Sequence, residues 1–309
     1  MLLLLYYQQY GHIIMKKKIV IAGGTGFIGK YLHKRFGEEG YEVLIISRDS
    51  THISWNDEKA LINAVEGAEL LINLAGKSVD CRYNEKNKSL IVSSRVETTK
   101  KLQSIIDKCT CPPKLWINSS TATIYRHSED KAMDEDTGEI GSGFSVEVAK
   151  AWEKAFFEKT TDNTRKVALR IAITIGKNGG VMKPFTNLVK CGLGGRQGNG
   201  RQMFSWVHIE DLFRVIQFVM TNKDMKGIYN CAAPNPVTNA SFMKEIRNIL
   251  KPVIHLPSPT FLLKAGAYFI NTETELILKS RWVVPKRLVE EGFIFTYSTL
   301  DEALENILE

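Results

Sequence analysis

The amino-acid sequence predicts an α/β fold, in which helices cover both faces of a doubly wound parallel sheet. In the first half of the 309-residue chain, apolar runs of strand length alternate with helix-like segments, and this alternation is typical of parallel sheets. The first apolar run ends in three spaced glycines, directly before a helix-like segment. The second half is richer in glycine and loop-like, so we expect a smaller C-terminal part beside the sheet.

The first strand, over residues 17–22, runs into the turn Gly23-x-x-Gly26-x-x-Gly29. In such a turn Gly23 permits the tight bend, Gly26 lets a phosphate approach the backbone, and Gly29 lets the helix pack close to the strand. Free N–H groups and the helix dipole at the start of the following helix favour a negative charge. The turn therefore predicts dinucleotide binding rather than a purely structural bend.

A helix over residues 30–39 and a strand over residues 41–46 follow, and the strand ends in Ser47-Arg48. A dinucleotide fold contacts the adenosine ribose at this strand end, and NAD sites place a carboxylate there. A hydroxyl and a guanidinium instead suit the 2′-phosphate of NADP, which an arginine binds through two hydrogen bonds. Asp49 lies past the strand end. The pair favours NADP over NAD, and an exposed loop arginine is the alternative.

Further along the chain the expected elements alternate in the same way. They are a helix ending at Val65 and capped by Asn56 or Asp57, a strand over 68–74, a helix over 87–108, a strand over 115–118, a helix over 144–159 and a strand over 166–175. Right-handed crossovers place the carboxyl ends of such strands at one edge of the sheet, where ligands bind. The segments expected to meet there are the glycine turn, Ser47-Arg48, and residues 74–76, 119–121 and 174–176.

The second half contains fewer regular elements. They are a helix over 212–221, a strand over 227–231, a helix over 240–250, a helix near 260–270 and a terminal helix from Thr299. We expect residues 15–180 to form the dinucleotide-binding core, with a contribution from residues 205–235. Residues 181–204 and 236–309 then form the C-terminal, substrate-side region.

The first 14 residues contain an apolar run that is too short to span a bilayer, and neither a preceding basic residue nor a small-residue cleavage site marks a signal peptide. We expect Met15 to be the true start and residues 1–14 to be a non-native or disordered extension. Five cysteines without a CxxC pair argue against a metal site and favour reduced thiols in a cytoplasm.

The net charge of +7 comes from basic residues spread along the chain, and the only basic run is residues 16–18. Nucleic-acid binding is therefore not required to explain the charge. We expect a small-molecule substrate, with neither a nucleic acid nor a membrane as partner. The sequence leaves a homodimer open.

Several motifs together point to a known group of proteins. They are Gly23-x-x-Gly26-x-x-Gly29, Asn73-Leu74-Ala75-Gly76, the strand end at Ser119, Ser120 and Thr121, Leu169-Arg170, and Trp206-Val207-His208-Ile209-x-Asp211. This set resembles the extended short-chain dehydrogenase/reductase superfamily. Residues 93–99, Trp152-Glu153, and residues 192–195, 234–240 and 284–288 narrow the resemblance to the atypical subgroup labelled "epimerase family protein". The resemblance covers about residues 16–309.

The resemblance implies a Rossmann fold with a small C-terminal substrate-side part, and NADP as cofactor. It also implies a C-terminal segment, about residues 250–300, that is peculiar to the subgroup and without assigned chemistry. Together with the glycine turn, the implied NADP-binding residues are Gly23, Thr25, Gly26, Phe27, Ile28, Gly29, Ser47, Arg48, Leu74, Ala75, Gly76, Arg95 and Thr174.

The chain departs from the superfamily at its catalytic pair, a Tyr followed four residues later by a Lys. When the helix is aligned on Glu153, the Tyr falls on Ser145 and the Lys on Ala149. None of the ten tyrosines is followed at this spacing by a lysine. Lys150 is one residue off, which rotates it by about 100° around the helix.

We expect the catalytic hydroxyl of the superfamily in Ser120 or Thr121, with a hydroxyl that only satisfies the strand end as the equal alternative. Tyr125, just past this strand, is a third catalytic candidate, with core packing as the alternative. The weaker acid/base candidates are His208 and Glu135. The weaker substrate-binding candidates are Arg196 and Arg201, for which exposed loop arginines are the equal alternative, and Trp206 is expected in the core.

These observations favour an NADP-dependent oxidoreductase or epimerase-like enzyme that acts on an unknown small molecule. The missing Tyr–Lys pair supports a second hypothesis, a non-catalytic NADP(H)-binding protein that acts as a regulator or scaffold. A role on nucleic acid or the ribosome is the weakest of the three, because only the basic charge supports it.

Overall fold

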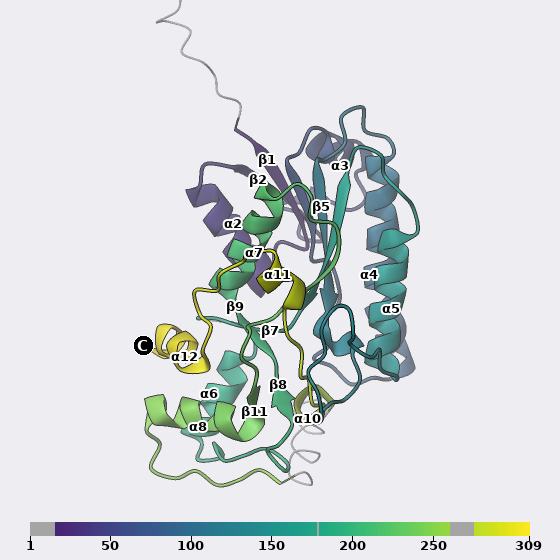
Figure 1. Cartoon of the computed structure of the whole chain (residues 1–309). Coiled ribbons are helices and arrows are strands. Elements are labelled where there is room, and N and C mark those ends of the chain that lie inside the picture. Colours follow the sequence, from purple (N-terminus) through teal and green to yellow (C-terminus); the bar gives the residue numbers. More distant parts are fainter. Residues whose placement is uncertain (1–15, 178, 260–274) are drawn as a thin grey trace, which may run out of the picture.

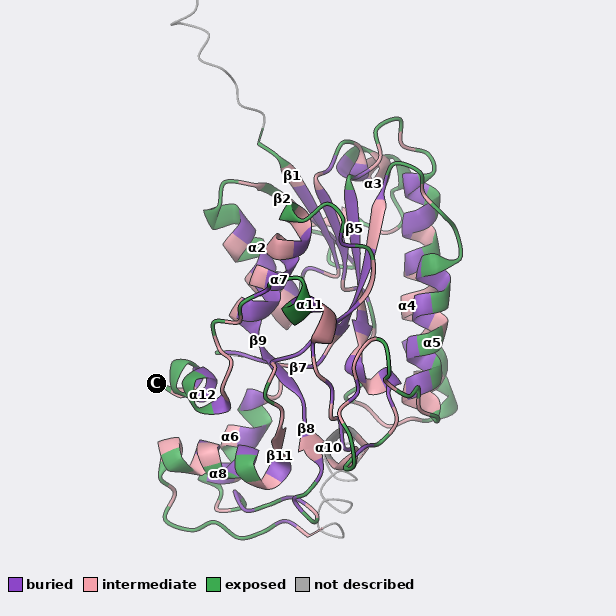
Figure 2. Ribbon diagram, in the orientation of Figure 1, coloured by how far each residue is buried: buried purple, intermediate pink, exposed green. Residues whose placement is uncertain are grey.

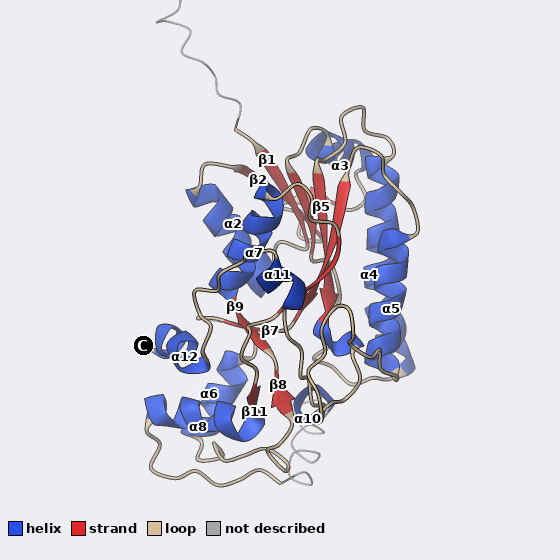
Figure 3. Cartoon of the chain, in the orientation of Figure 1, coloured by secondary structure: helices blue, strands red, loops and turns tan. Residues whose placement is uncertain are grey.

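The computed structural model describes residues 16–177, 179–259 and 275–309. At its centre lies a parallel seven-stranded sheet with the strand order β10-β6-β5-β4-β1-β2-β3. Helices cover both faces of this sheet, and a smaller group of helices lies beyond its carboxyl end (Figure 1, Figure 3). This architecture confirms the predicted Rossmann-type α/β fold. The strand order reverses between β1 and β4, which is where such folds bind their ligands.

The elements have the following bounds. The sheet contains β1 (Lys18–Ala22), β2 (Glu42–Ser47), β3 (Ile53–Ser54), β4 (Leu70–Asn73), β5 (Leu115–Thr121), β6 (Arg165–Ile171) and β10 (Gly227–Cys231). Two smaller sheets pair β7 (Ile173–Ile175) with β9 (Trp206–His208) and β8 (Met203–Phe204) with β11 (Val237–Thr238). The helices are α2 (Phe27–Glu38), α3 (Glu58–Val65), α4 (Glu85–Ile106), η1 (Ala122–Ile124), α5 (Phe144–Phe157), α6 (Met182–Lys190), α7 (Ile209–Thr221), α8 (Asn239–Leu250), α10 (Glu275–Leu278), α11 (Lys286–Glu290) and α12 (Leu300–Leu308).

The central strands are buried on both faces, as expected for a parallel sheet covered by helices. Alternate residues of β1 point to opposite sides, so Ile21 packs with Phe36 of α2 and Phe213 of α7, whereas Val20 packs with Leu102 of α4. The rings of Phe36 and Phe213 meet edge to face, with centroids 4.9 Å apart. Figure 2 shows the resulting buried layer through the sheet. This core fixes the position of every strand end.

The expected continuous strand over residues 166–175 is interrupted, and this part of the prediction is wrong. The backbone N–H of Ala172 donates to the carbonyl of Cys231 at 2.9 Å, and that of Ile173 donates to the carbonyl of Ser205 at 3.2 Å. The chain thus leaves β10 and pairs with β9 at this point. An apolar run cannot reveal such a change of partner, because both halves remain strand.

The smaller C-terminal part has a core of its own, formed by α6, α8 and α12 around Phe204 and Phe242, whose rings stack 4.1 Å apart. The sequence did not predict α6 or α11. Gly179-Gly180 and residues 191–200, on either side of α6, gave that segment a loop-like composition. The expected helix near 260–270 and the extension 1–14 lie outside the described residues. The division into domains stays a prediction.

Within the described ranges, no helix is both long enough and apolar enough to cross a membrane. No group of three or more His, Cys, Asp or Glu side chains in these ranges could hold a metal ion. All five cysteines are free thiols.

Candidate cofactor and substrate site

In the turn between β1 and α2, two glycines have backbone atoms too close to leave room for a Cβ. Gly23 has a φ of +80°, and a Cβ built on it would lie 2.8 Å from the backbone nitrogen of Ala75. A Cβ on Gly29 would lie 2.5 Å from the Cα of Gly24. Both positions require glycine, because a side chain would push backbone apart. These contacts hold the turn and the start of α2 against the residues that follow β4.

Gly26 differs from these two glycines because the space beside it is open. A Cβ on Gly26 would have its nearest neighbour, the carbonyl oxygen of Gly23, at 3.8 Å, and the φ of −78° suits any residue. Gly26 is the N-cap of α2, and the first turn of the helix contains neither a side-chain cap nor an acidic residue. Uncapped helix N-termini bind phosphates through free N–H groups. The turn therefore fits a pyrophosphate, which would use the space that a side chain would fill.

At the end of β2, the carboxylate of Asp49 bonds within its own loop. It accepts hydrogen bonds from the N–H of Thr51 at 3.0 Å and its hydroxyl at 2.9 Å, and these bonds lower the pKa of Asp49. Ser47 is buried and accepts from the N–H of Asp49 at 2.9 Å. Arg48 is exposed and makes no hydrogen bond or ion pair with other described residues. The guanidinium of Arg48 is thus the available charge at this strand end.

Two buried asparagines fix the bend after β4. The amide nitrogen of Asn73 donates to the side-chain oxygen of Asn118 at 2.7 Å and to the hydroxyl of Thr99 at 3.0 Å. The amide oxygen of Asn73 accepts from the backbone N–H of Ala75 at 3.1 Å. Every side-chain hydrogen-bonding atom of this group lies in the buried core, where an unpaired polar group is costly. The position of Leu74 and Ala75 against the glycine turn is therefore set by side chains from three elements.

Arg95 of α4 lies directly beside Gly76. A Cβ on Gly76 would lie 3.0 Å from the guanidinium carbon, which itself stacks 5.1 Å from the ring centroid of Trp152. The guanidinium donates to the carbonyls of Lys77 at 3.1 Å and Ile91 at 2.9 Å. Burial lowers the pKa of Arg95 to about 10. A desolvated cation whose hydrogen bonds in the described part of the chain go to neutral carbonyls favours a negatively charged or strongly polar ligand.

The residues after β7 pack on the start of α2. A Cβ on Gly179 would lie 2.2 Å from the ring of Phe27, and one on Gly180 would lie 3.0 Å from the same ring and 3.1 Å from the carbonyl oxygen of Thr174. This packing brings Thr174 to the glycine turn. The predicted segments therefore meet at one place, which we call the carboxyl edge. We call residues 23–29, 47–48, 74–76 and Arg95 the cofactor end of this edge.

Behind the end of β5 lies a buried polar network, defined by Ser120, Tyr125, Glu153, Arg170 and Asn230. Arg170 donates to both carboxylate oxygens of Glu153 at 2.8 Å and to the hydroxyl of Tyr125 at 2.8 Å. Ser120 donates to Glu153 at 2.6 Å, and Tyr125 donates to the side-chain oxygen of Asn230 at 3.0 Å. Tyr125 is 2% exposed. The hydroxyls of Ser120 and Tyr125 are thus committed to this network.

Of the three predicted catalytic hydroxyls, that of Thr121 lies outside this network. Thr121 is half-buried, and its hydroxyl accepts from the N–H of Thr123 at 3.1 Å. On α5, Ala149 is fully buried, so the expected lysine position faces the core. Lys150 is exposed and pairs with Glu147 at 3.0 Å on the outer face of the helix. Lys150 therefore does not replace the missing lysine.

Comparisons with known proteins agree with this geometry. The model of the NAD dependent epimerase/dehydratase family matches residues 19–232. The chain belongs to this family. A second model, for a domain of unknown function called DUF1731, matches residues 258–307. The family assignment and the subgroup resemblance drawn from the motifs are confirmed.

Relatives and solved structures resemble almost the whole chain. Epimerase family protein YfhF of Bacillus subtilis is 33% identical over 302 residues, which cover 94% of this chain and 97% of the relative. Epimerase family protein SDR39U1 of Homo sapiens is 30% identical and covers 94% of this chain and 99% of the relative. The crystal structure of human SDR39U1 (isoform 2) with NADPH has a TM-score of 0.85 at 29% identity, covering 94% of this chain and 98% of that chain. The nucleoside-diphosphate sugar epimerase of Corynebacterium glutamicum has a TM-score of 0.76 at 26% identity, covering 95% and 58%.

The motif Trp206-Val207-His208-Ile209-x-Asp211, which spans β9 and the start of α7, connects the sheet to the C-terminal segment. His208 is buried, which lowers its pKa to about 4, and it caps α7 by accepting from the N–H of Glu210 at 3.2 Å. Asp211 is fully buried and accepts from the N–H groups of Thr296 and Tyr297, both at 2.8 Å. A histidine that is neutral and used as a cap is poorly suited to proton transfer. Like the expected core residue Trp206, which is fully buried, His208 has a structural role.

The three remaining candidates lie away from the cofactor end. Glu135 accepts from backbone N–H groups of β10 and α11, at 2.8 and 3.4 Å, and burial raises its pKa. It therefore fastens its loop to the fold. Arg196 and Arg201 are exposed, and the guanidinium of Arg201 lies 3.8 Å from Glu129.

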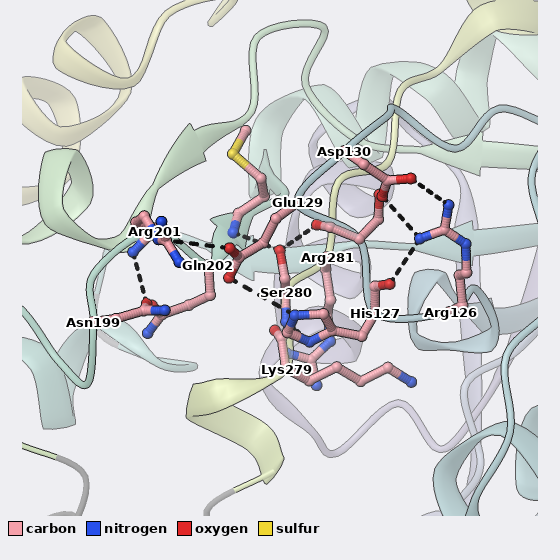
Figure 4. A network of polar contacts seen from close by, with 12 residues as sticks. Arg126, His127, Glu129, Asp130, Asn199, Arg201, Gln202, Lys279, Ser280 and Arg281 are labelled. Atoms are coloured by element: carbon pink, nitrogen blue, oxygen red, sulfur yellow. Dashed lines mark hydrogen bonds and ion pairs between the residues drawn. The ribbon is translucent and has the colours of Figure 1, made fainter.

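The sequence interpretation missed two cations that contact Thr123, two residues after Thr121. Lys279 donates to the carbonyl of Thr123 at 2.8 Å, and the Nε of Arg281 donates to the hydroxyl of Thr123 at 3.1 Å. Figure 4 shows Lys279 and Arg281 next to Ser280, within a network of polar contacts. We call Thr121, Thr123, Lys279 and Arg281 the substrate end of the carboxyl edge. No local motif marks the two cations, because they lie more than 150 residues from their partner, at separations of 156 and 158.

Proposed function

We propose that the protein is an NADP-binding oxidoreductase or epimerase-like enzyme that acts on a small molecule at the carboxyl edge. The observation that carries this proposal is the uncapped start of α2, with open space beside Gly26 and no acidic residue in its first turn. The human relative SDR39U1 was crystallised with NADPH, which supports the same cofactor here. A bound nicotinamide cofactor supplies or accepts a hydride.

The chain's own residues would divide the remaining roles. The N–H groups at the start of α2 bind the pyrophosphate, and the guanidinium of Arg48 binds the 2′-phosphate. The hydroxyl of Thr121 orients the substrate by a hydrogen bond. The buried network that contains Glu153 and Arg170 holds the end of β5, and with it Thr121, in place. Proton transfer would require a group other than the usual Tyr–Lys pair, because Ala149 occupies the lysine position.

The cofactor assignment is tested with Arg48→Ala. We expect the Kd for NADPH to rise roughly 10- to 100-fold, since a charge-assisted hydrogen bond contributes about 1.5–3 kcal/mol, while the Kd for NADH changes less than about twofold. Fluorescence titration of both cofactors measures this. Lys34→Ala is the matched control, because Lys34 is an exposed cation, 74% accessible, on the outer face of α2. Equal weakening of NADPH and NADH by Arg48→Ala would contradict the 2′-phosphate assignment.

The missing Tyr–Lys pair supports a second candidate function, an NADP(H)-binding regulator or scaffold without turnover. Ala149 is buried and Lys150 faces outward, so the described helix α5 supplies no substitute. Loss of NADPH absorbance over a broad panel of carbonyl compounds separates the two functions. An enzyme oxidises NADPH with some member of the panel and slows in Thr121→Ala, whereas a regulator binds NADPH and leaves every member unchanged.

We also propose that the protein works in a reducing cytoplasm, on the basis of its five free cysteines. Mass measurement of the natively expressed protein after alkylation in denaturant, which exposes the buried Cys231, tests this proposal. Five alkylated thiols are expected, and a disulfide would contradict it.

A further inference from the structure

A large open groove lies where the strands of the central sheet begin, at the edge opposite the carboxyl edge. Among the residues that line it, Lys17 precedes β1, Lys114 precedes β5, Arg165 begins β6 and Lys226 precedes β10. The strands of this sheet are parallel, so their first residues lie together at one edge (Figure 1). The N–H of Arg165, for example, donates to the carbonyl of Lys114 at 3.0 Å. We call this feature the amino-edge groove.

The amino-edge groove is separate from the proposed cofactor and substrate site. Its volume is about 1090 Å³, and none of the residues placed at the carboxyl edge lines it. Pockets for small molecules typically measure about 300–1,000 Å³. The groove is therefore large enough for an extended ligand.

Positive charge is in excess along the groove. Seven lysine or arginine side chains line it, against the two carboxylates of Glu69 and Asp162. Glu69 is paired with Lys114 at 2.6 Å, and Lys159 is paired with Asp107 at 3.2 Å. The cations that remain exceed the carboxylates that could neutralise them.

Two of these cations are used by the fold itself. The ammonium of Lys166 donates to the side chain of Gln103 and to two carbonyls at the end of α5, over 2.6–3.0 Å. The guanidinium of Arg165 donates to the carbonyls of Val219 and Met225, both at 2.7 Å. Cations at these positions compensate the negative carboxyl ends of α5 and α7. The charge available to a ligand therefore comes from other side chains.

Three lysines supply that charge. Lys17, Lys223 and Lys226 are exposed, and their side chains make no hydrogen bond or ion pair within the described ranges. Carboxylates are bound best by the rigid fork of an arginine, whereas lysine binds phosphate as a point charge without a fixed geometry. Because the arginine of the groove is already used, its free cations suit a row of phosphates better than an acidic polypeptide.

An exposed aromatic ring lies in the same groove. Phe157, the last residue of α5, lines the groove and is 38% exposed. Its ring is held edge to face against that of Phe156, with centroids 4.7 Å apart. Exposed rings beside a basic groove are stacking positions for the bases of single-stranded nucleic acids. Thr164 of the same lining is 4% exposed, and its hydroxyl has no partner in the described part of the chain.

We propose that the amino-edge groove binds a single-stranded nucleic acid. The phosphates contact Lys17, Lys223 and Lys226, and one base stacks on Phe157. This inference goes beyond the proposed function and does not depend on it. The sequence favoured no nucleic-acid partner because its basic residues are spread along the chain, but the parallel sheet brings several of them to one edge.

The experiment measures binding of the full chain to fluorescently labelled single-stranded RNA and DNA of about 12 nucleotides. Anisotropy is recorded without NADPH, from about 50 to about 200 mM salt. We expect saturable binding that weakens with salt. The triple variant Lys17→Gln, Lys223→Gln, Lys226→Gln should weaken binding at about 50 mM salt by at least about tenfold. It should also reduce the slope of log K against log salt by about 2, because each lost phosphate contact removes about 0.7.

The control is a second triple variant, Lys183→Gln, Lys190→Gln, Lys244→Gln. It removes the same charge from exposed positions of α6 and α8 and should bind the oligonucleotides as the wild type does. The Kd for NADPH should be unchanged in the groove variant, which shows that the fold and the carboxyl edge are intact.

The stacking position is tested with Phe157→Leu. This variant should weaken oligonucleotide binding by at least about fivefold and leave the salt slope unchanged, because a base loses its ring but no phosphate loses its cation. Labelled polyglutamate of matched charge is the acidic polypeptide probe and should bind more weakly than the oligonucleotides.

Several outcomes would overturn this proposal. Absence of RNA and DNA binding at about 50 mM salt would exclude the site. Equal weakening by the two triple variants would assign the binding to general surface charge. Polyglutamate binding as tight as that of the oligonucleotides, or wild-type affinity in Phe157→Leu, would show that the groove does not recognise a single strand.

Discussion

At the cofactor end of the carboxyl edge, most groups belong to short stretches of chain, whereas at the substrate end they come from segments far apart in the sequence. The turn from Gly23 to Gly29 contains its own bend, its own open space and the start of its own helix. Thr123 instead meets Lys279 across 156 residues. The cofactor end is therefore encoded by local sequence, whereas the substrate end depends on tertiary packing. Substitutions at the two ends should therefore affect ligand binding and folding in different proportions.

Glu153→Ala should destabilise the protein more than any other substitution considered, and it tests how far the substrate end depends on packing. Glu153→Ala leaves the guanidinium of Arg170 buried without its carboxylate and removes the acceptor of Ser120. We expect the free energy of unfolding to fall by about 3–5 kcal/mol, the usual cost of one unpaired charge in a buried ion pair. Urea denaturation followed by circular dichroism measures this.

Tyr125→Phe is the matched control for that prediction. It removes one hydroxyl from the same network and should cost only about 1–2 kcal/mol. If Glu153→Ala cost less than Tyr125→Phe, the buried ion pair would not be the part that holds the end of β5.

The glycine turn was predictable because its physical causes lie within one stretch of sequence. The positive φ of Gly23 and the tight contacts of Gly29 follow from the strand–turn–helix pattern alone. The same holds for the parallel sheet, whose apolar runs alternate with helical segments. The position of Arg48 at a strand end was equally local, and the available guanidinium agrees with the interpretation.

The substrate end was less predictable, for reasons that individual residues make clear. Ser120 and Thr121 are neighbours of the same chemical type, and only the position of Glu153 on another element decides that Ser120 faces inward. The strand over 166–175 divides because two different strands offer it partners at Ala172. Lys279 and Arg281 reach Thr123 only after the whole C-terminal region has folded back, which no short pattern in the sequence reveals.

Substitutions at two glycines of the same turn, Gly26 and Gly29, should differ in their effects on stability and on NADPH binding. Gly26→Ala places a methyl group in open space, so the free energy of unfolding should change by less than about 1 kcal/mol, whereas the Kd for NADPH should rise at least about tenfold because the pyrophosphate loses its approach. Gly29→Ala forces a methyl group against the Cα of Gly24 and should destabilise the protein by about 3 kcal/mol. Thermal unfolding and NADPH titration of both variants measure this contrast.

That contrast breaks down in either of two ways. If Gly26→Ala bound NADPH as the wild type does, the open space would not be the pyrophosphate position. If Gly29→Ala were as stable as Gly26→Ala, the contact between α2 and the turn would not require glycine.

The smallest change in stability is expected from protonation of His208. This residue connects the sheet to the C-terminal segment, because its ring packs on that of Tyr297 with centroids 3.9 Å apart. Burial lowers the pKa of His208 from 6.5 to about 4, although the nearby charge of Asp211 opposes this shift. Between these two values the unfolded chain binds more protons than the folded one, so stability is lost as pH falls from 6.5 towards 4. We expect the free energy of unfolding to drop by about 1–2 kcal/mol between pH 7 and pH 5 on account of this residue.

His208→Asn isolates the contribution of His208 protonation to stability, since asparagine can still cap α7. Urea midpoints at pH 7 and pH 5 should differ less in His208→Asn than in the wild type. His33→Asn removes an exposed histidine of α2 and should retain the wild-type difference. An identical loss of stability in His208→Asn and the wild type would show that protonation of His208 is not the cause of the loss.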